Sequence, residues 1–265
     1  MKKEKASGLI VLLTDFGLKD PYVGILKGVV ASRVPEAKII DLSHDISPQN
    51  VAQAAFFLRA STPYFPPGAL FVCVIDPGVG SQRNILWVKT NKHQFLAPDN
   101  GVLSWIEDPI LESRIVANRR WMNFDISNTF HGRDIFAPVA AELIKGKTAR
   151  LLGPKTLRKV ICPWPKPLLN SDRILGEIIF IDHFGNCISN IEPSKLRVLN
   201  SKRELRIFFR GKNWGPLRRH YAEVLKNQPL CLTSSFGFLE LAVREGSFSA
   251  RFKAKIGEKI ECRWN

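Results

Sequence analysis

The sequence lacks the features that define several large classes of protein. Its 265 residues include five cysteines, none in a CxxC spacing, which argues against a disulfide framework or a zinc site and favours a reducing, cytoplasmic setting. No apolar run approaches the roughly 20 residues that a membrane-spanning helix needs, so we expect no membrane association. With 45% hydrophobic residues and no internal repeat, the chain is typical of a folded globular protein with one large or two ordinary domains.

Acidic residues are few relative to basic ones. The chain has 39 Lys+Arg against 24 Asp+Glu, a net charge of +15, and such a balance is common in nucleic-acid-binding proteins. The stretch 195–219 alone carries nine basic residues and one acidic residue, so about half of the excess lies in 25 residues rather than along an extended array. No helix-turn-helix pattern accompanies it. The sequence therefore argues against a nucleic-acid partner. The alternative hypothesis is a non-enzymatic nucleic-acid binder that acts through 195–219.

Apolar runs alternate with helical patterns in the first half of the chain. Helices are expected to begin near Pro21 and Pro48, and a third over 134–144. Strands are expected at 9–13, 38–42, 70–75, 85–88 and 94–96. Strands that alternate with helices and are apolar throughout predict a parallel, Rossmann-like α/β sheet.

The second half has a different pattern. A stretch rich in proline, 152–168, is interpreted as a linker. Short strands separated by Gly, Asn and Ser follow it at 174–181, 205–209, 230–233, 238–243 and 256–262. We therefore predict an N-terminal α/β domain over 1–160 and a small C-terminal β-barrel domain over 161–265.

Two aspartates follow apolar strands of the expected sheet. Asp15 comes after the first strand and Asp76 after the third. Ligands of open α/β sheets bind beyond the carboxyl ends of the strands, so the two residues together indicate a site, although either alone would suit a turn. The nearby glycines match neither a GxGxxG fingerprint nor a P-loop, so a phosphate-bearing ligand has little support.

Two further residues can reach the same edge. Arg83 lies seven residues after Asp76, close enough to return to its loop. His131 precedes the expected third helix, where a lone His is more often a cap than a catalyst. His44 lies near Asp41 and Asp45, but no further cluster of metal-ligating residues accompanies them, so we expect no metal site.

Six motifs occur in the order found in the S-adenosylmethionine hydroxide adenosyltransferases. They are LTDFG (13–17), DPGVGSQR (76–83), APDNGVL (97–103), NTFHGRD (128–134), DHFGN (182–186) and SSFGFLELAV (234–243). The chain thus resembles this family, which is related to the fluorinase and chlorinase enzymes, over nearly its whole length. The resemblance implies a homotrimer whose active sites lie between the N-terminal domain of one subunit and the barrel of the next. It also implies hydrolysis of S-adenosylmethionine, in some members its R-epimer at sulfur, to adenosine and methionine without a cofactor.

The resemblance assigns the catalytic roles to three residues. Asp76 would hold and deprotonate a water molecule, and Arg83 would keep that carboxylate ionised. His131 would orient the water or share its proton, and whether Asp76 or His131 accepts the proton stays open.

The substrate-binding residues implied by the resemblance come from both domains. Asp15 would accept both ribose hydroxyls, and Asn186 would read the adenine. Ser235 and Glu240 would face the methionine end of the substrate. The other implied contacts are Asp182, the stacking face of Phe184, and Val243 beside the base.

A halogenase of the same fold is the competing enzyme hypothesis. In the family pattern, halide users carry Tyr at the positions of Asp76 and His131 and an additional loop, which is absent between Arg83 and Asp99. Water is therefore the expected nucleophile. One departure from the halide users is Gln49, which stands where they place an aromatic residue, and another is a DHFGN loop shorter by one residue.

Overall fold

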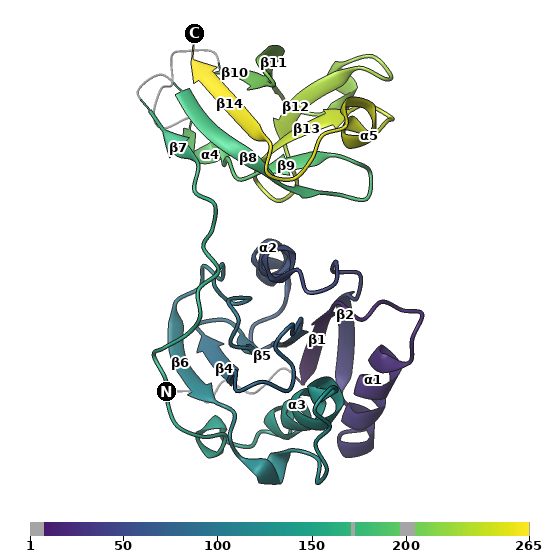
Figure 1. Cartoon of the computed structure of the whole chain (residues 1–265), viewed down its shortest axis with the longest axis vertical. Helices are drawn as coiled ribbons and strands as arrows, with labels where there is room; N and C mark the ends of the chain where they lie inside the picture. The colour runs from purple at the N-terminus through teal and green to yellow at the C-terminus, as the bar shows by residue number, and fades with distance from the viewer. Residues whose placement is uncertain (1–7, 171–172, 197–204, 265) are drawn as a thin grey trace. The chain divides into compact units, whose positions relative to one another are not determined.

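The computed structural model describes residues 8–170, 173–196 and 205–264. The chain divides into two compact units, Met1–Trp164 and Pro165–Asn265. The first unit combines helices with a sheet, and the second is built mainly of β-strands (Figure 1). The expectation of an α/β region followed by a small β-barrel is confirmed, and the Rossmann-like detail stays a prediction.

The N-terminal unit contains a six-stranded sheet of order β2-β1-β3-β5-β4-β6. Its strands are β1 (Leu9–Thr14), β2 (Lys38–Ser43), β3 (Leu70–Val74), β4 (Ile85–Thr90), β5 (Gln94–Pro98) and β6 (Ile110–Ile115). The expected parallel pairing is confirmed for β1 with β2 and β3, and for β3 with β5. In contrast to a wholly parallel sheet, β4 runs antiparallel to β5 and β6. The tight turn at 91–93 joins neighbouring strands, and such a short connection permits only antiparallel pairing.

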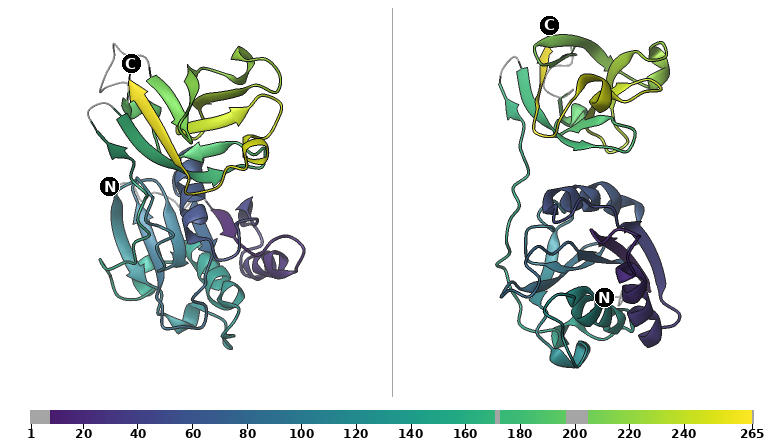
Figure 2. Two further views of the ribbon diagram at one scale, coloured as in Figure 1. Left: turned by 45° about the horizontal axis from the view of Figure 1, so that its top comes forward. Right: turned by 45° about the vertical axis from the view of Figure 1, so that its right-hand side comes forward.

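Helices cover both faces of this sheet (Figures 1 and 2). They are α1 (Tyr22–Arg33), α2 (Val51–Ser61) and α3 (Ala137–Ile144), the last preceded by a π-helical turn, η3 (Gly132–Phe136). Alternate side chains of a strand point to opposite faces. Ile10 and Leu12 therefore pack in the core formed with α1 and α3, and Val11 and Leu13 pack in the core formed with α2. Burial on both faces explains why β1 is apolar at nearly every position.

The strands of the C-terminal unit close into a barrel, as its curled outline in Figure 2 shows. The ring runs β8-β14-β10-β11-β12-β13-β9 and returns to β8, with β7 paired to β8 as an additional strand. The bounds are β7 (Leu168–Leu169), β8 (Arg173–Ile181), β9 (Cys187–Ser189), β10 (Leu205–Phe209), β11 (Lys212–Arg218), β12 (Pro229–Thr233), β13 (Leu239–Val243) and β14 (Lys259–Trp264). Closure leaves few free strand edges, and the interior is filled by apolar side chains such as Ile178, Phe209 and Leu241.

Short elements complete the two units. They are α4 (Pro193–Leu196), α5 (Phe248–Phe252) and the 3-10 turns η1 (Thr62–Tyr64), η2 (Arg119–Trp121), η4 (Ala149–Leu151) and η5 (Tyr221–Glu223). Gly257, with a φ of +89°, makes a turn before β14, so this strand begins three residues later than its apolar pattern suggests. In the described part of the chain, no helix has both the length and the apolar character needed to cross a bilayer.

Part of the basic stretch 195–219 forms β10 and β11. Residues 197–204, which include Arg203, lie outside the described residues. The Arg210 guanidinium donates to the carboxylate of Glu258 at 2.9 Å and to a backbone carbonyl. The Lys212 ammonium lies 4.8 Å from the centre of the Trp214 ring. Both charges therefore have partners within the barrel.

Candidate active site

The carboxyl ends of β1 and β3 bring Asp15 and Asp76 to one cavity. The parallel register sets Thr14 opposite Val74, so the residues that follow lie at the same edge of the sheet. A cavity of about 440 Å³ at this edge is lined by both aspartates and by His131. Its volume lies in the range of small-molecule sites.

Asp76, Arg83 and His131 form a continuous chain of hydrogen bonds. Arg83 Nε donates to Asp76 Oδ1 at 2.6 Å, and Arg83 Nη2 donates to Asp76 Oδ2 and to His131 Nδ1, the latter at 2.9 Å. The side chains of Asp76 and Arg83 are only 6% and 11% exposed, so this pair is shielded from bulk water. The structure thus brings together the three residues that the sequence assigns to catalysis.

The bond from Arg83 fixes the tautomer of His131. A guanidinium can only donate, so His131 Nδ1 is the acceptor and the ring proton lies on Nε2. Burial and the charge of Arg83 lower the pKa of His131. The ring is therefore neutral at pH 7 and presents an N–H group rather than a second acceptor.

Gly80 allows the loop that carries Asp76 and Arg83 to approach the segment that carries His131. It has a φ of +79°, and a Cβ at this position would lie 2.5 Å from the backbone oxygen of Asn128. Any other residue would push the two loops apart or strain the backbone. Gly80 therefore serves the packing of these two loops.

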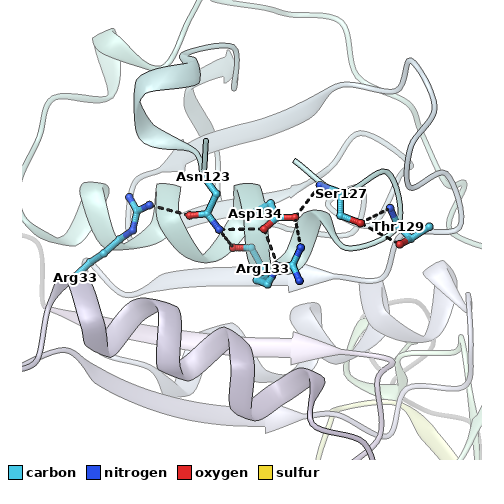
Figure 3. Close-up of polar contacts among 6 residues, drawn as sticks. All are labelled: Arg33, Asn123, Ser127, Thr129, Arg133 and Asp134. Atoms are coloured by element: carbon cyan, nitrogen blue, oxygen red, sulfur yellow. Dashed lines mark hydrogen bonds and ion pairs between the residues drawn. The ribbon is translucent and has the colours of Figure 1, made fainter. Parts of the chain in front are cut away.

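A buried carboxylate fixes the segment before α3 (Figure 3). Asp134 is 1% exposed and accepts hydrogen bonds from Ser127 N at 2.9 Å, from Asn123 Nδ2 at 3.0 Å and from Arg133 Nε at 2.7 Å. Burial alone would raise its pKa, but these hydrogen bonds outweigh burial and lower the pKa of Asp134 to about 2. Asn123 also accepts from Arg33 at 2.9 Å, which ties the network to the end of α1.

Asp15 is held by the backbone of a neighbouring loop. Its Oδ2 accepts from Gln49 N at 2.8 Å, and Gln49 itself lines the cavity with a φ of +64°. The preceding residue, Thr14, contacts His44 Nδ1 at 2.8 Å, and His44 Nε2 lies 3.1 Å from Asp41 Oδ1. His44 thus supports the end of β1. No group of three or more potential metal ligands occurs among the described residues.

Three aromatic residues that the sequence reasoning missed also line the cavity. Phe16, Tyr22 and Phe130 contact one another with ring centroids 5.2–5.9 Å apart. Phe16 and Phe130 belong to the LTDFG and NTFHGRD motifs, which was the signal available, whereas Tyr22 has no distinguishing pattern. An aromatic wall beside two carboxylates suits a ligand with a cationic centre.

The C-terminal unit has a cavity of its own, of about 490 Å³. It is lined by Phe184, Asn186 and Val243, three of the residues that the sequence assigns to substrate binding. Asp182 accepts from Asn186 N at 2.8 Å and from Asn186 Nδ2 at 2.9 Å, so it orients this amide. Phe184 is 73% exposed, which leaves its ring free to stack on a ligand.

Glu240 and Ser235 occupy different settings in the same unit. Glu240 is 3% exposed, burial raises its pKa, and it accepts a hydrogen bond from Tyr221 Oη at 2.6 Å. Ser235 is exposed on the loop between β12 and β13. Neither is among the described residues that line these two cavities, whereas Tyr221, which the sequence pattern did not single out, lines the second one.

These features define a class of protein with an α/β unit, a β-barrel unit and a carboxylate–guanidinium–imidazole site built for a small molecule. The N-terminal unit matches the model of the SAM hydroxide adenosyltransferase N-terminal domain over residues 10–153. The model of the C-terminal domain of the same family matches residues 176–261. The chain belongs to the SAM hydroxide adenosyltransferase family.

Individual relatives agree with this assignment. An (R)-S-adenosyl-L-methionine hydrolase from Thermus thermophilus is 34% identical over 262 residues, which is 95% of this chain and 98% of that protein. A fluorinase from Actinoplanes sp. is 24% identical over 94% of this chain and 95% of its own length. The crystal structure of an uncharacterized conserved protein from Thermotoga maritima has a TM-score of 0.90 and 36% identity, covering 96% of this chain and 99% of that one.

Proposed function

We propose that this protein hydrolyses S-adenosyl-L-methionine, including its R-epimer at sulfur, to adenosine and L-methionine. The observation that carries this proposal is the Asp76–Arg83–His131 chain at a cavity that also contains Asp15. The sulfonium substrate is a cation, and two carboxylates with an aromatic wall complement it. Relatives named (R)-S-adenosyl-L-methionine hydrolase, 33–36% identical to this chain, support the same reaction.

In the proposed reaction, water displaces methionine from the 5′ carbon of the ribose. The water oxygen supplies the electron pair of the new C5′–O bond, and the electron pair of the breaking C5′–S bond stays on sulfur. Methionine leaves as a neutral thioether, so the leaving group needs no proton. The chemistry is redox-neutral, and we propose that it needs no cofactor.

The geometry favours Asp76 as the acceptor of the water proton. Both of its oxygens accept from Arg83, but each carboxylate oxygen keeps a second lone pair. His131 Nδ1 is already occupied by Arg83, so its Nε2–H can donate to the water oxygen and orient it. In this assignment Arg83 fixes the position of the Asp76 carboxylate and holds His131 in the donating tautomer.

Substrate binding is divided between the two units in this proposal. Asp15 accepts the ribose hydroxyls, and Asn186, oriented by Asp182, reads the adenine edge. Phe184 stacks on the base, which also contacts Val243. The residues assigned to the methionine end are Ser235 and Glu240.

We also propose a homotrimer in which the α/β unit of one subunit and the barrel of the next complete each site. Support comes from the division of the assigned residues between two units that each contain a cavity. The five cysteines are free thiols, which supports a reducing, cytoplasmic setting for the enzyme.

Hydrolysis in oxygen-18 water tests the proposed function. The 5′ hydroxyl of the released adenosine should carry one labelled oxygen, measured by mass spectrometry with the R- and S-epimers supplied separately. Unlabelled adenosine, or none from either epimer, would contradict hydrolysis at C5′. A parallel reaction with added chloride distinguishes the halogenase alternative, because a 5′-chloro nucleoside would form only there.

A further inference from the structure

The cavity of the N-terminal unit contains one cationic side chain among its described lining residues. Arg133 lines this cavity together with Asp15 and Asp76, and its side chain is 40% exposed. The other basic group of the site, Arg83, is not among the described lining residues and is paired with Asp76. His131 is neutral. Arg133 is thus the cation available to an anionic group of a ligand bound here.

The guanidinium of Arg133 is held in place before any ligand binds. Its Nε and Nη2 atoms donate to the two carboxylate oxygens of Asp134, at 2.7 and 2.8 Å, which leaves Nη1 without a partner among the described residues. Its Cζ lies 5.3 Å from the centre of the Phe130 ring, which also lines the cavity. Asp134 is fixed in turn by Ser127 and Asn123 (Figure 3). A guanidinium fixed on one edge loses little further freedom when its other edge binds a ligand.

The proposed substrate has one group that requires such a partner. S-adenosylmethionine carries a sulfonium, an ammonium and a single carboxylate, and its adenosine part is uncharged. The carboxylates of the cavity suit the sulfonium and the ribose hydroxyls, but they would repel the substrate carboxylate. On the basis of the proposed function, we propose that Arg133 binds the carboxylate of the methionine end through Nη1 and thereby selects substrates that carry it. The alternative is that Arg133 serves only to hold Asp134.

The test compares S-adenosylmethionine with its decarboxylated analogue, which keeps the sulfonium and the adenosine. The ratio of kcat/KM for the two substrates is measured in wild type and in Arg133→Gln. A charge-assisted bond to the carboxylate predicts a wild-type preference for S-adenosylmethionine of about 10- to 100-fold. In Arg133→Gln the ratio should fall to near one. The matched control is Arg150→Gln, an exposed arginine outside the cavity lining, which should keep the wild-type ratio.

A second variant controls for loss of folding in Arg133→Gln. Arg133→Gln leaves Asp134 without its cation, so Arg133→Gln/Asp134→Asn removes both charges and should show the same loss of discrimination. A ratio unchanged in both variants, equal losses on both substrates, or a wild type that does not discriminate would each overturn the proposal. If the wild type released no adenosine, the proposed reaction would fail. The ratio of the two dissociation constants, measured by calorimetry, would then test the carboxylate contact on its own.

Discussion

Replacing Asp76 affects both catalysis and stability. In Asp76→Ala the proposed base is lost, and general-base catalysis is typically worth about 10²- to 10⁴-fold in rate. The variant also leaves Arg83, only 11% exposed, without its carboxylate. Removing one partner of such a shielded pair costs about 3–5 kcal/mol, which corresponds to a melting temperature lower by about 6–20 °C.

The double variant Asp76→Ala/Arg83→Met distinguishes the two effects. It removes both charges, so much of the lost stability should return, because a shielded ion pair contributes little relative to apolar replacements. Its activity should stay as low as that of Asp76→Ala. The assays are adenosine release by chromatography and thermal unfolding by circular dichroism, both at pH 7.

Either of two results would contradict the role of Asp76 as the base. If Asp76→Ala kept more than about a tenth of the wild-type kcat while folded, Asp76 would not be the base. If the double variant recovered activity along with stability, the loss in the single variant would come from the stranded Arg83 charge.

Residues around the site have separable effects on activity and on stability. Because the pKa of His131 lies below its ordinary 6.5 and its Nδ1 must accept a hydrogen bond, kcat/KM should fall only below pH 6.5, and a loss above that pH would contradict this role. The carboxyl pKa of Asp134 falls from 3.8 to about 2 on folding, so it contributes about 2 kcal/mol above pH 3.8 that is lost as the pH falls through 2. Urea unfolding should therefore show a difference between wild type and Asp134→Asn that shrinks with falling pH; a constant difference would exclude this linkage. Gly80→Ala should reduce activity at least tenfold, since its Cβ would lie 2.5 Å from the Asn128 carbonyl. Gly24→Ala, in open space on α1, should keep activity and add about 0.5–1 kcal/mol of stability by urea unfolding.

The sheet of the N-terminal unit was predictable where its strands are apolar throughout. Residues 9–13 and 70–75 are apolar because both faces of β1 and β3 are buried, and that burial requires helices on each side. The strands β6, β7, β9 and β11 were not foreseen. Their residues are partly exposed or few, so the sequence shows no strong alternation there.

The site was predictable to a lesser extent. Asp15 and Asp76 could be placed in one site because both follow strands of a parallel sheet, and strand ends meet at one edge. Arg83 and His131 were assigned through the motifs of the family rather than through their own pattern. Tyr22 and Tyr221 line the two cavities without any local signal, because each is the first residue of its element, α1 or η5, and tertiary packing rather than sequence periodicity positions it.

The sequence by itself determined the two-part architecture and the carboxylates at the strand ends, because apolar periodicity and strand termini are local properties of the chain. Only the tertiary structure decided which side chains of the site contact one another. Arg83 and His131 are 48 residues apart, and their contact depends on how two loops pack around Gly80. That contact fixes the tautomer of His131. In the same way, only the fold placed Arg133 in one cavity with the carboxylates of Asp15 and Asp76, since the charge of a site is a sum over segments distant in sequence.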